Sequence, residues 1–408
     1  MKNKKIAIIA ICSAAVIVLS VCLFFVAQAV SAGKTVAQLY LYGDMSEMTS
    51  KKDVRSVTAT FKQGAVKVNR YATIKVQGSS SLAYDKKNYT IKFFKDPEHE
   101  KIGSVDVGWG KQNEYCLKAN WIDKTHCRNV VTAKLASEVQ AKYGIMEQAP
   151  KNGLIDGFPV EIYINDEYHG LYTWNIPKSA WQFNMDEENP NHIVLCGEMW
   201  EAPTLFLEEP NFDCWSVEVG PEGDETLEKL SRLSEFIMTS SDEDFKNNID
   251  QYLDLDAVLN YYILVDFAHL PDNCGKNMLL VTYDGKVWIP SLYDLDTSWG
   301  VDWKGKELYD YENERVPFAG TNNLAKRVEE NFAKELQERY FELREEILTK
   351  EHVWGLFESF DEQIGEEFKA REVERWGTEI PGYDLDQIEK YLDTVIDLLD
   401  QKYRDLGT

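Results

Sequence analysis

The spacing of hydrophobic residues changes once along this chain, and that change limits the fold more than any other feature. Residues 36–95 contain four segments, VAQLYLYG, SVTATFKQ, YATIKVQG and NYTIKFFK, which are rich in β-branched and aromatic residues and separated by Gly, Asp and Asn. This composition predicts strands. NEYCLKANW predicts another strand, and FPVEIYINDEYHGLYTWNIP predicts a hairpin that turns at residues 165–167.

A single long helix is expected within this β-rich part. In IDKTHCRNVVTAKLASEVQAKYG, Asp123 can cap a helix, and Gly144 can end it. Val131, Leu135 and Val139 recur at helical spacing and form one apolar stripe. The segment therefore predicts one long helix.

From Asp224 onward the spacing is helical, in DETLEKLSRLSEFIMTS, in DLDAVLNYYILVDFAHL and through most of residues 323–406. We expect an α+β fold with a β-rich N-lobe at about residues 33–190 and a mainly helical C-lobe at about 220–408. The boundary falls within 185–225, which is rich in Glu, Pro and Asn. Such a division favours a ligand cleft between the lobes.

The chain begins with a segment that predicts export. Residues 6–30 carry no charge, which is long enough to cross a bilayer, and lysines precede them. AQAVSAG also offers the small residues that a signal peptidase accepts. Residues 1–32 are thus expected to be a membrane anchor or a cleaved signal. The remaining chain would face the outside of the cell, anchored or secreted.

The charge of the chain excludes one class of partner. Its formal net charge is −25, and the three lysines before Gly33 are the only charges there, so the exported part carries −28. Such a surface repels nucleic acid and anionic lipid, and it suits a basic partner or simple solvation. The five cysteines beyond residue 32 include no C-x-x-C pair, which argues against a structural zinc site. A disulfide such as Cys196–Cys214 and free buried thiols both remain open.

One stretch, residues 269–300, concentrates acidic and amide side chains around a turn. Asp284–Gly285 lies between two apolar runs and predicts a two-residue hairpin. In that register Asn277 faces Leu292, and Asp294 is its diagonal neighbour on the same face. Asp272 precedes Asn277 by five residues, and Asp296 is a second acid at the strand end.

This arrangement has the groups that phosphoryl transfer requires. One carboxylate must orient the attacking hydroxyl, while an amide and a second carboxylate hold Mg²⁺ on the nucleotide phosphates. The order of an Asp, an Asn, a hairpin and an Asp follows a protein-kinase catalytic loop and metal-binding loop. Acids that serve only as turn residues are the alternative interpretation.

Four blocks resemble a known family. VQGSSSLAYDKKNYTIKF, EYCLKANWIDKTHCRNVVTAKLA, PVEIYINDEYHGLYTW and NMLLVTYDGKVWIPSLYDLDTSWG are similar, in this order, to blocks of the CotH family of spore-coat-type atypical kinases. The resemblance covers about residues 70–345. It implies a kinase-like two-lobed fold and transfer of the γ-phosphate of ATP, with Mg²⁺ or Mn²⁺, to Ser or Thr of a protein.

The resemblance also implies roles by position. Asp272 would be the catalytic acid/base, and Asn277 and Asp294 would be metal ligands, with Asp296 in reserve. Two departures stand out: Gln77-Gly78-Ser79-Ser80 replaces Arg-Gly-Asn-Ser, and Tyr293 replaces a Trp.

The residues that would bind the nucleotide are less defined. Lys92 or Lys87 could contact the phosphates from a strand, although a solvated lysine is the plain alternative. The candidates for further contacts are the Gly78-Ser79-Ser80 turn, Glu138 as a partner of the lysine, and Arg128 and Asn129 near the nucleotide or in a structural role.

Two other functions remain open. The chain could be a non-catalytic surface or adhesion protein that keeps the fold, or it could transfer AMP instead of phosphate. A basic, Ser- and Lys-rich protein substrate would suit the negative charge. The six histidines have no H-x₃-H or H-E-x-x-H spacing, and no G-x-S-x-G segment indicates a serine hydrolase.

Overall fold

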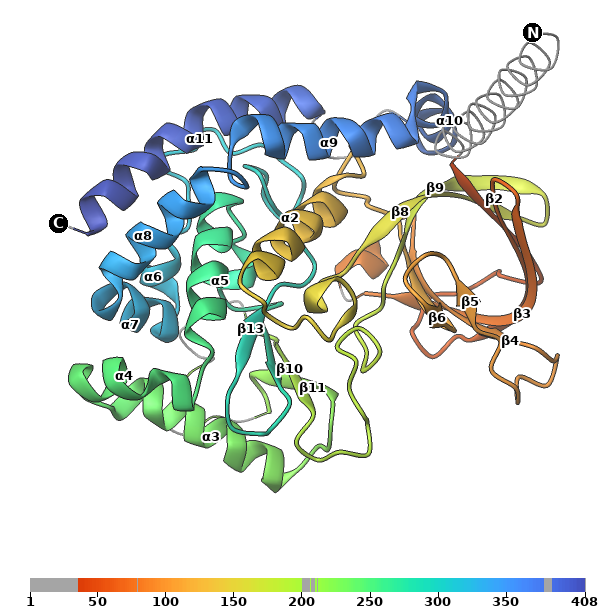
Figure 1. Ribbon diagram of the computed structural model, residues 1–408. Coiled ribbons are helices and arrows are strands. Elements are labelled where there is room, and N and C mark those ends of the chain that lie inside the picture. Colours follow the sequence, from red (N-terminus) through yellow and green to blue (C-terminus); the bar gives the residue numbers. More distant parts are fainter. Residues whose placement is uncertain are drawn as a thin grey trace, which may run out of the picture.

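A closed β-barrel forms the first part of the molecule, on the right in Figure 1. The computed structural model describes residues 36–78, 80–199, 206, 210, 212–377 and 384–407. The barrel strands are connected in the order β1-β2-β3-β4-β7-β9-β8, and β1 closes it by pairing in parallel with β8. Their bounds are β1 (Ala37–Tyr42), β2 (Arg55–Gln63), β3 (Val66–Gln77), β4 (Asn88–Phe94), β7 (Glu114–Lys118), β8 (Gly157–Ile164) and β9 (Glu167–Asn175).

Large aromatic side chains fill the barrel. Phe61, Phe93, Tyr115 and Trp174 belong to one buried cluster, and the Phe93 and Trp174 rings stack with centroids 5.8 Å apart. Inward-facing residues alternate with outward-facing ones along the strands, as a small barrel requires. The barrel interior is therefore a packed core.

A second sheet lies beside the barrel, with strand order β11-β10-β12-β13. These strands are β10 (Ile193–Gly197), β11 (Trp215–Val219), β12 (Leu279–Thr282) and β13 (Ile289–Ser291), and a short pair β5 (Val105–Asp106) and β6 (Lys111–Gln112) stands apart. The sequence predicted only the β12–β13 hairpin. Strands β10 and β11 extend it into a sheet.

The predicted two-residue turn of that hairpin is wrong by one step of register. Leu279 pairs with Ser291, so the loop spans residues 283–288. The Asp284 carboxylate accepts hydrogen bonds from the amides of Lys286 (2.8 Å) and Val287 (2.9 Å), which favours a wider loop. The acids beyond β13 are consequently placed by other contacts.

Ten α-helices occur in the described part of the chain. They are α2 (Arg128–Lys142), α3 (Asp224–Thr239), α4 (Asp242–Asn248), α5 (Leu255–Phe267), α6 (Phe318–Thr321), α7 (Asn323–Asn331), α8 (Ala333–Arg344), α9 (Lys350–Ile364), α10 (Glu366–Trp376) and α11 (Leu385–Leu406). Helix α5 is buried along nearly its whole length, since α2, α8, α11 and β13 pack around it. Short 3-10 helices lie at Ser80–Ala83, Pro150–Gly153, Ile249–Gln251 and Asp272–Cys274.

The α+β class is confirmed, whereas the expected kinase-like two-lobed fold is wrong. The strands of the first part close on themselves, so this part is a barrel and not an open sheet covered by one long helix. Helix α2 packs with α5 and α9 instead, and its buried side chains belong to the core of the helical body. The seven-stranded barrel and the second sheet replace the expected arrangement. The division of the chain into the two predicted lobe ranges stays a prediction.

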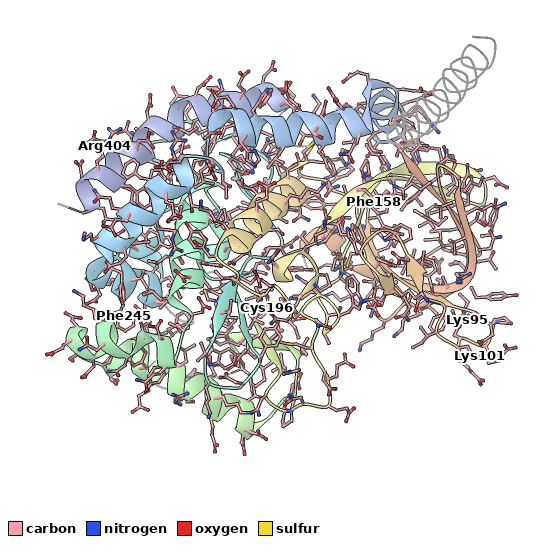
Figure 2. The ribbon with its side chains drawn as sticks, viewed as in Figure 1. Lys95, Lys101, Phe158, Cys196, Phe245 and Arg404 are labelled. Atoms are coloured by element: carbon pink, nitrogen blue, oxygen red, sulfur yellow. The ribbon has the colours of Figure 1, made fainter. Side chains whose placement is uncertain are left out.

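Helix α10 fastens the barrel to the helical body, and Figure 1 shows it above the end of β9. Lys86 and Glu372 form a buried ion pair at 2.5 Å, and Arg371 pairs with the buried Glu161 at 2.7 Å. Figure 2 places Lys95 and Lys101 at the outer tip of the barrel and Cys196 at the centre of the view, between Phe158 and Phe245. The centre of the molecule is thus where barrel, second sheet and helices meet.

The predicted anchor or signal, residues 1–32, lies outside the described residues. Among the described helices, none combines the length and hydrophobicity that a membrane span requires. Export and membrane attachment stay predictions. All five described cysteines are buried and free, so the Cys196–Cys214 disulfide is not formed.

Candidate functional site

A cavity of about 570 Å³ lies between the barrel and the second sheet. Its lining includes Gly78 and Lys118 from the barrel, and Cys196 and Glu218 from β10 and β11. The volume falls within the range of small-molecule sites, roughly 300–1,000 Å³. Since both the barrel and the second sheet contribute to its walls, residues far apart in the sequence can act together here.

The four predicted catalytic and metal-binding residues all line this cavity: Asp272, Asn277, Asp294 and Asp296. Asp272 begins the 3-10 helix that follows α5, and Asn277 lies just before β12. Asp294 and Asp296 follow β13. The structure therefore brings the predicted acids and amide together, although the register that predicted it differs by one residue.

Unusual backbone conformations aim two of these side chains. Asn277 has φ +67° and Asp294 has φ +55°, both in the left-handed region that few non-glycine residues adopt. The buried Asn273 amide holds the two segments together, because its Nδ2 donates to the carbonyls of Asn277 (3.2 Å) and Tyr293 (2.9 Å). Such strain persists where surrounding contacts enforce it, which is common at functional sites.

Helix α2 fixes the loop that carries Asp294 and Asp296. The Asn129 side-chain oxygen accepts a hydrogen bond from the Leu295 amide at 2.9 Å, between the two acids. One helical turn later, Thr132 Oγ1 accepts from Trp299 Nε1 at 2.7 Å. The sequence left the role of Asn129 open, and these contacts give it a positioning role.

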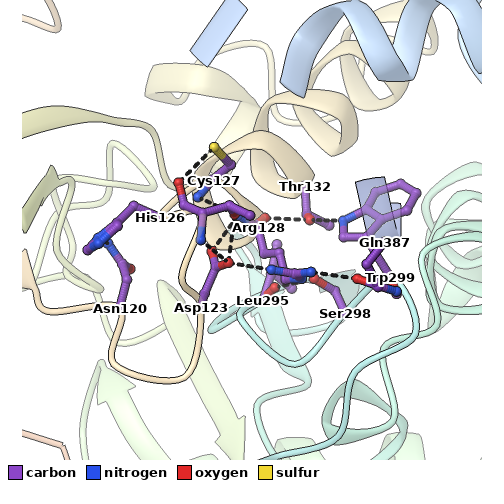
Figure 3. Close-up of polar contacts among 11 residues, drawn as sticks. Asn120, Asp123, His126, Cys127, Arg128, Thr132, Leu295, Ser298, Trp299 and Gln387 are labelled. Atoms are coloured by element: carbon purple, nitrogen blue, oxygen red, sulfur yellow. Dashed lines mark hydrogen bonds and ion pairs between the residues drawn. The ribbon is translucent and has the colours of Figure 1, made fainter. Parts of the chain in front are cut away.

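Arg128 is fully buried and structural in its contacts, as Figure 3 shows. Its guanidinium pairs with Asp123 and donates to Gln387 of α11 at 2.6 Å. Gln387 in turn donates to the Trp299 carbonyl at 2.8 Å. Arg128 is absent from the cavity lining, so the expected nucleotide contact does not follow from its position. The Asp123 carboxylate also accepts a hydrogen bond from the Arg128 backbone amide. Because α2 begins at Arg128, Asp123 does not occupy the N-cap position that the sequence predicted for it.

The acids repel one another in a partly desolvated space. Burial, followed by the charge of Asp294, raises the pKa of Asp272 to about 7. The same two causes raise the pKa of Asp296 to about 8. Lys118 Nζ lies 3.1 Å from Asp294 and relieves part of this repulsion. Burial opposes the charge of Lys118, but Asp294, Tyr293, Cys116 and Asp296 together raise the pKa of the lysine above its ordinary value.

These groups fit a hard divalent cation. Carboxylate and amide oxygens are the donors that Mg²⁺ and Mn²⁺ select, and three carboxylates share this cavity with the Asn277 amide. Asp294, Asn277 and Asp296 are the residues that would hold it. Bound there, the cation would supply charge neutralisation for phosphate oxygens.

Comparison with known proteins places the chain in a family. A family model described as CotH kinase protein matches residues 74–404, most of the chain. The chain belongs to the CotH kinase family. No curated protein matches it. The resemblance predicted from four sequence blocks is thereby confirmed, and membership identifies a kinase-type protein. All four clustered polar residues lie within the matched range.

In this member of the CotH kinase family, three other predicted nucleotide contacts lie away from the cavity. Lys92 points outward from the barrel and pairs with Glu114 at 3.7 Å, because the inward positions of β4 belong to its neighbours. Lys87 Nζ donates to the Leu82 carbonyl at 2.9 Å and so holds its own loop. Glu138 of α2 contacts His352 of α9 at 2.5 Å instead of a lysine.

The structure describes only part of the Gly78-Ser79-Ser80 turn. Gly78 lines the cavity with φ +108°, and a Cβ there would meet Ser81 Oγ at 1.9 Å, so only glycine fits. Ser79 lies outside the described residues, and Ser80 begins a 3-10 helix. A phosphate contact from this turn remains a prediction.

Sequence reasoning missed two of the lysines that line the cavity. Lys118 ends β7, and Lys178 follows β9 with its Nζ 2.8 Å from Glu218 and 4.5 Å from the centre of the Tyr293 ring. Lys118 lies in CLKANW, within one of the four blocks that carried the family resemblance. Its position at a strand end, within that block, was the available signal.

A second polar cluster lies in the same cavity, formed by Cys196, Glu198 and Glu218. Among described residues these form a group of three potential metal-ligand atoms within 4.8 Å of one another. The Lys178 ammonium already pairs with Glu218, and Ser216 Oγ donates to Glu198 at 2.9 Å. Those contacts supply the positive charge and protons that the cluster needs, which favours a polar wall over a metal centre.

Proposed function

We propose that this protein transfers the γ-phosphate of ATP to a Ser or Thr hydroxyl of a protein, with Mg²⁺ or Mn²⁺. The observation that carries the proposal is the convergence of Asp272, Asn277, Asp294 and Asp296 with Lys118 in one cavity. Membership of the CotH kinase family supports the same reaction class.

Each residue has a separate task in this proposal. Asp272 accepts the proton of the acceptor hydroxyl as its oxygen bonds to phosphorus, and the bond to the departing ADP oxygen breaks. A carboxylate with a pKa of about 7 suits that task, because it is deprotonated in part at neutral pH and still a competent base. Lys118 provides a fixed positive charge for phosphate oxygens, as the strand lysine does in phosphoryl-transfer sites.

The proposed acceptor is a basic protein rich in Ser and Lys. The net charge of −25 would attract such a chain from solution. Within the cavity lining, Glu198 is exposed and can pair with an incoming cationic side chain. The rest of the lining is mixed in charge, so this contact would lie at the edge of the site.

The test uses the purified protein with γ-labelled ATP, α-labelled ATP and Mn²⁺, and a Ser- and Lys-rich acceptor. Label transferred only from the γ position is the expected result. Label transferred from the α position would replace the proposal with AMP transfer. No transfer of either label, with no nucleotide-dependent rise in melting temperature, would leave a non-catalytic protein.

A further inference from the structure

The first four strands of the barrel contain no acidic residue. Strands β1, β2, β3 and β4 carry six lysines and arginines but no Asp or Glu, in a chain with 69 acidic residues against 44 basic ones. The other barrel strands, β7, β8 and β9, each contain a Glu. The charge of these four strands is therefore a local exception to the acidic character of the chain.

The basic side chains of these strands face solvent. Along β3, Ala72, Ile74 and Val76 are buried in the barrel core, whereas Lys67 and Lys75 are exposed. Figure 1 shows β2 and β3 on the side of the barrel away from the helices. The outward surface of β1–β4, called the acid-free wall below, is thus open to a partner.

Two lysines lie directly opposite each other at one end of this wall. Lys62 of β2 pairs in register with Lys67 of β3, an arrangement of like charges that destabilises an antiparallel pair. Of the four lysines of the wall, Lys92 alone pairs with a carboxylate within the described part of the chain, Glu114 at 3.7 Å. Lys62 places its Nζ 4.1 Å from the centre of the Tyr40 ring, which is neutral. The positive charge of this end is left for a partner to balance.

The turn between the two lysines exposes a small apolar tip. Val66 is 49% exposed, and Gly64 and Ala65 before it are exposed as well. Lysines flank this tip on both strands. Such a tip can reach the interface of a bilayer while the flanking ammonium groups stay with the phosphates, because a lysine stem is apolar and its head is charged.

The path of the chain brings this end of the barrel close to the predicted anchor. The apolar segment ends at residue 30, and β1 begins at Ala37. Seven residues span at most about 25 Å. Gln38, the second residue of β1, pairs in register with Lys62. An anchored chain would therefore hold the lysine pair beside the lipid headgroups.

The net charge of −25 does not prevent contact between the wall and an anionic surface. Charges are screened beyond about 8 Å at physiological ionic strength, so the side chains that touch a surface decide the contact. Sixty of the 69 acidic residues follow residue 118, and the helical body lies across the barrel from β2 and β3 in Figure 1. The repulsion expected from the whole chain therefore does not apply to this wall.

We propose that the acid-free wall rests on anionic phospholipid headgroups of the membrane, with its Lys62–Lys67 end nearest the anchor. This inference rests on the predicted anchor and is independent of the proposed phosphate transfer. Lys67 lies near the start of β3, and Gly78, directly after that strand, lines the cavity. Strand β3 is 12 residues long, which corresponds to roughly 40 Å. The contact would thus leave the cavity away from the lipid and open to an acceptor in solution.

The test places the full chain in vesicles of phosphatidylcholine, with or without phosphatidylglycerol, and acetylates lysines with a reagent that does not cross the bilayer. Mass spectrometry gives the acetylation of Lys62, Lys67 and Lys75 relative to the exposed Lys246 of α4. Each lysine near an anionic leaflet favours contact about fivefold, so three favour it on the order of a hundredfold. The ratio should fall at least about fivefold in anionic vesicles at low salt and recover in molar salt.

Paired variants separate the wall from net charge alone. Lys62→Gln combined with Lys67→Gln should remove the protection of Lys75 in anionic vesicles. Lys326→Gln combined with Lys334→Gln is the matched control, because both side chains are exposed on helices, at 63% and 74%, and the change in charge is the same. That control should leave Lys75 protected.

Several results would overturn the proposal. These are equal acetylation ratios in the two kinds of vesicle, protection of Lys75 that persists without Lys62 and Lys67, and a mature chain that lacks the apolar segment. Protection by soluble polyphosphate but not by anionic vesicles would assign the wall to a free polyanion instead. Protection in neutral vesicles that increases with protein density would assign it to a second copy. Because acetylation is the readout, the proposed phosphate transfer stands or fails separately.

Discussion

The buried Lys86–Glu372 pair offers a quantitative test of how the C-terminal helices support the cavity. The two side chains are 1% and 4% exposed, with Nζ and Oε1 2.5 Å apart. Lys86 Nζ also donates to the Ala119 carbonyl at 3.0 Å, and Glu372 Oε2 accepts from the Leu171 amide at 2.7 Å. Because Lys86 lines the cavity, loss of the pair disturbs both the attachment of α10 and the cavity wall.

Removing one partner leaves the other charge buried and uncompensated, which costs about 3–5 kcal/mol. Lys86→Met and Glu372→Gln should each lower the free energy of unfolding by that amount in urea titrations followed by circular dichroism. The double variant should recover much of the loss, because neither charge then remains. Lys92→Met is the control, since its pair with Glu114 is exposed and worth about 0–1 kcal/mol.

The variant that leaves Lys86 without its partner should also respond to pH. In Glu372→Gln, burial holds the pKa of Lys86 below its unfolded value, so the native state binds fewer protons and stability rises with pH. If both single variants lost under about 1 kcal/mol, as Lys92→Met should, the pair would not exist as described.

The remaining predictions concern the cavity itself. Lys118→Met should reduce phosphate transfer at least tenfold while Lys92→Met leaves it unchanged, and equal rates for both would refute the placement of the cation. Asn129→Ala should cost about 1–3 kcal/mol of stability and lower transfer, because the Leu295 amide loses its partner; urea unfolding and initial rates measure both effects. Transfer should fall as pH drops below about 7, where Asp272 becomes protonated, and a rate independent of pH between 5 and 8 would contradict its role as the base.

The sequence predicted local structure well where one pattern decides it. The hairpin at residues 165–167 is confirmed, because Asn165 and Asp166 adopt the positive φ values of +50° and +67° that its turn needs. The stripe of Val131, Leu135 and Val139 is buried on α2 as expected. These features depend on neighbouring residues alone.

The long-range features of the fold could not be predicted from the sequence, for a physical reason. Closure of the barrel depends on β1 pairing in parallel with β8, more than a hundred residues later, and no local pattern specifies that pairing. The predicted hairpin register was wrong because the Asp284 carboxylate accepts a hydrogen bond from the Lys286 backbone amide, which favours a loop wider than two residues. The sequence favoured Lys92 over Lys118 because the alternation along a strand shows only which residues share a face. Which of these faces meets the cavity depends on how the barrel packs against the rest of the molecule.

The acid cluster was nevertheless brought together as predicted, through contacts that the sequence did not reveal. Asn273 joins the Asn277 and Tyr293 segments, and Asn129 holds Leu295. The spacing of the acids and amide suggested a site, while buried amides from other elements build it.

The central claim is that Asp294 belongs to the phosphate-transfer site and Asp284 does not. Transfer of γ-labelled phosphate to a Ser- and Lys-rich acceptor should be compared for the wild type, Asp294→Ala and Asp284→Ala at equal folded concentration. Asp294→Ala should abolish transfer, and Asp284→Ala, whose acid only accepts hydrogen bonds within its turn, should retain it. Undiminished transfer by Asp294→Ala would contradict the account.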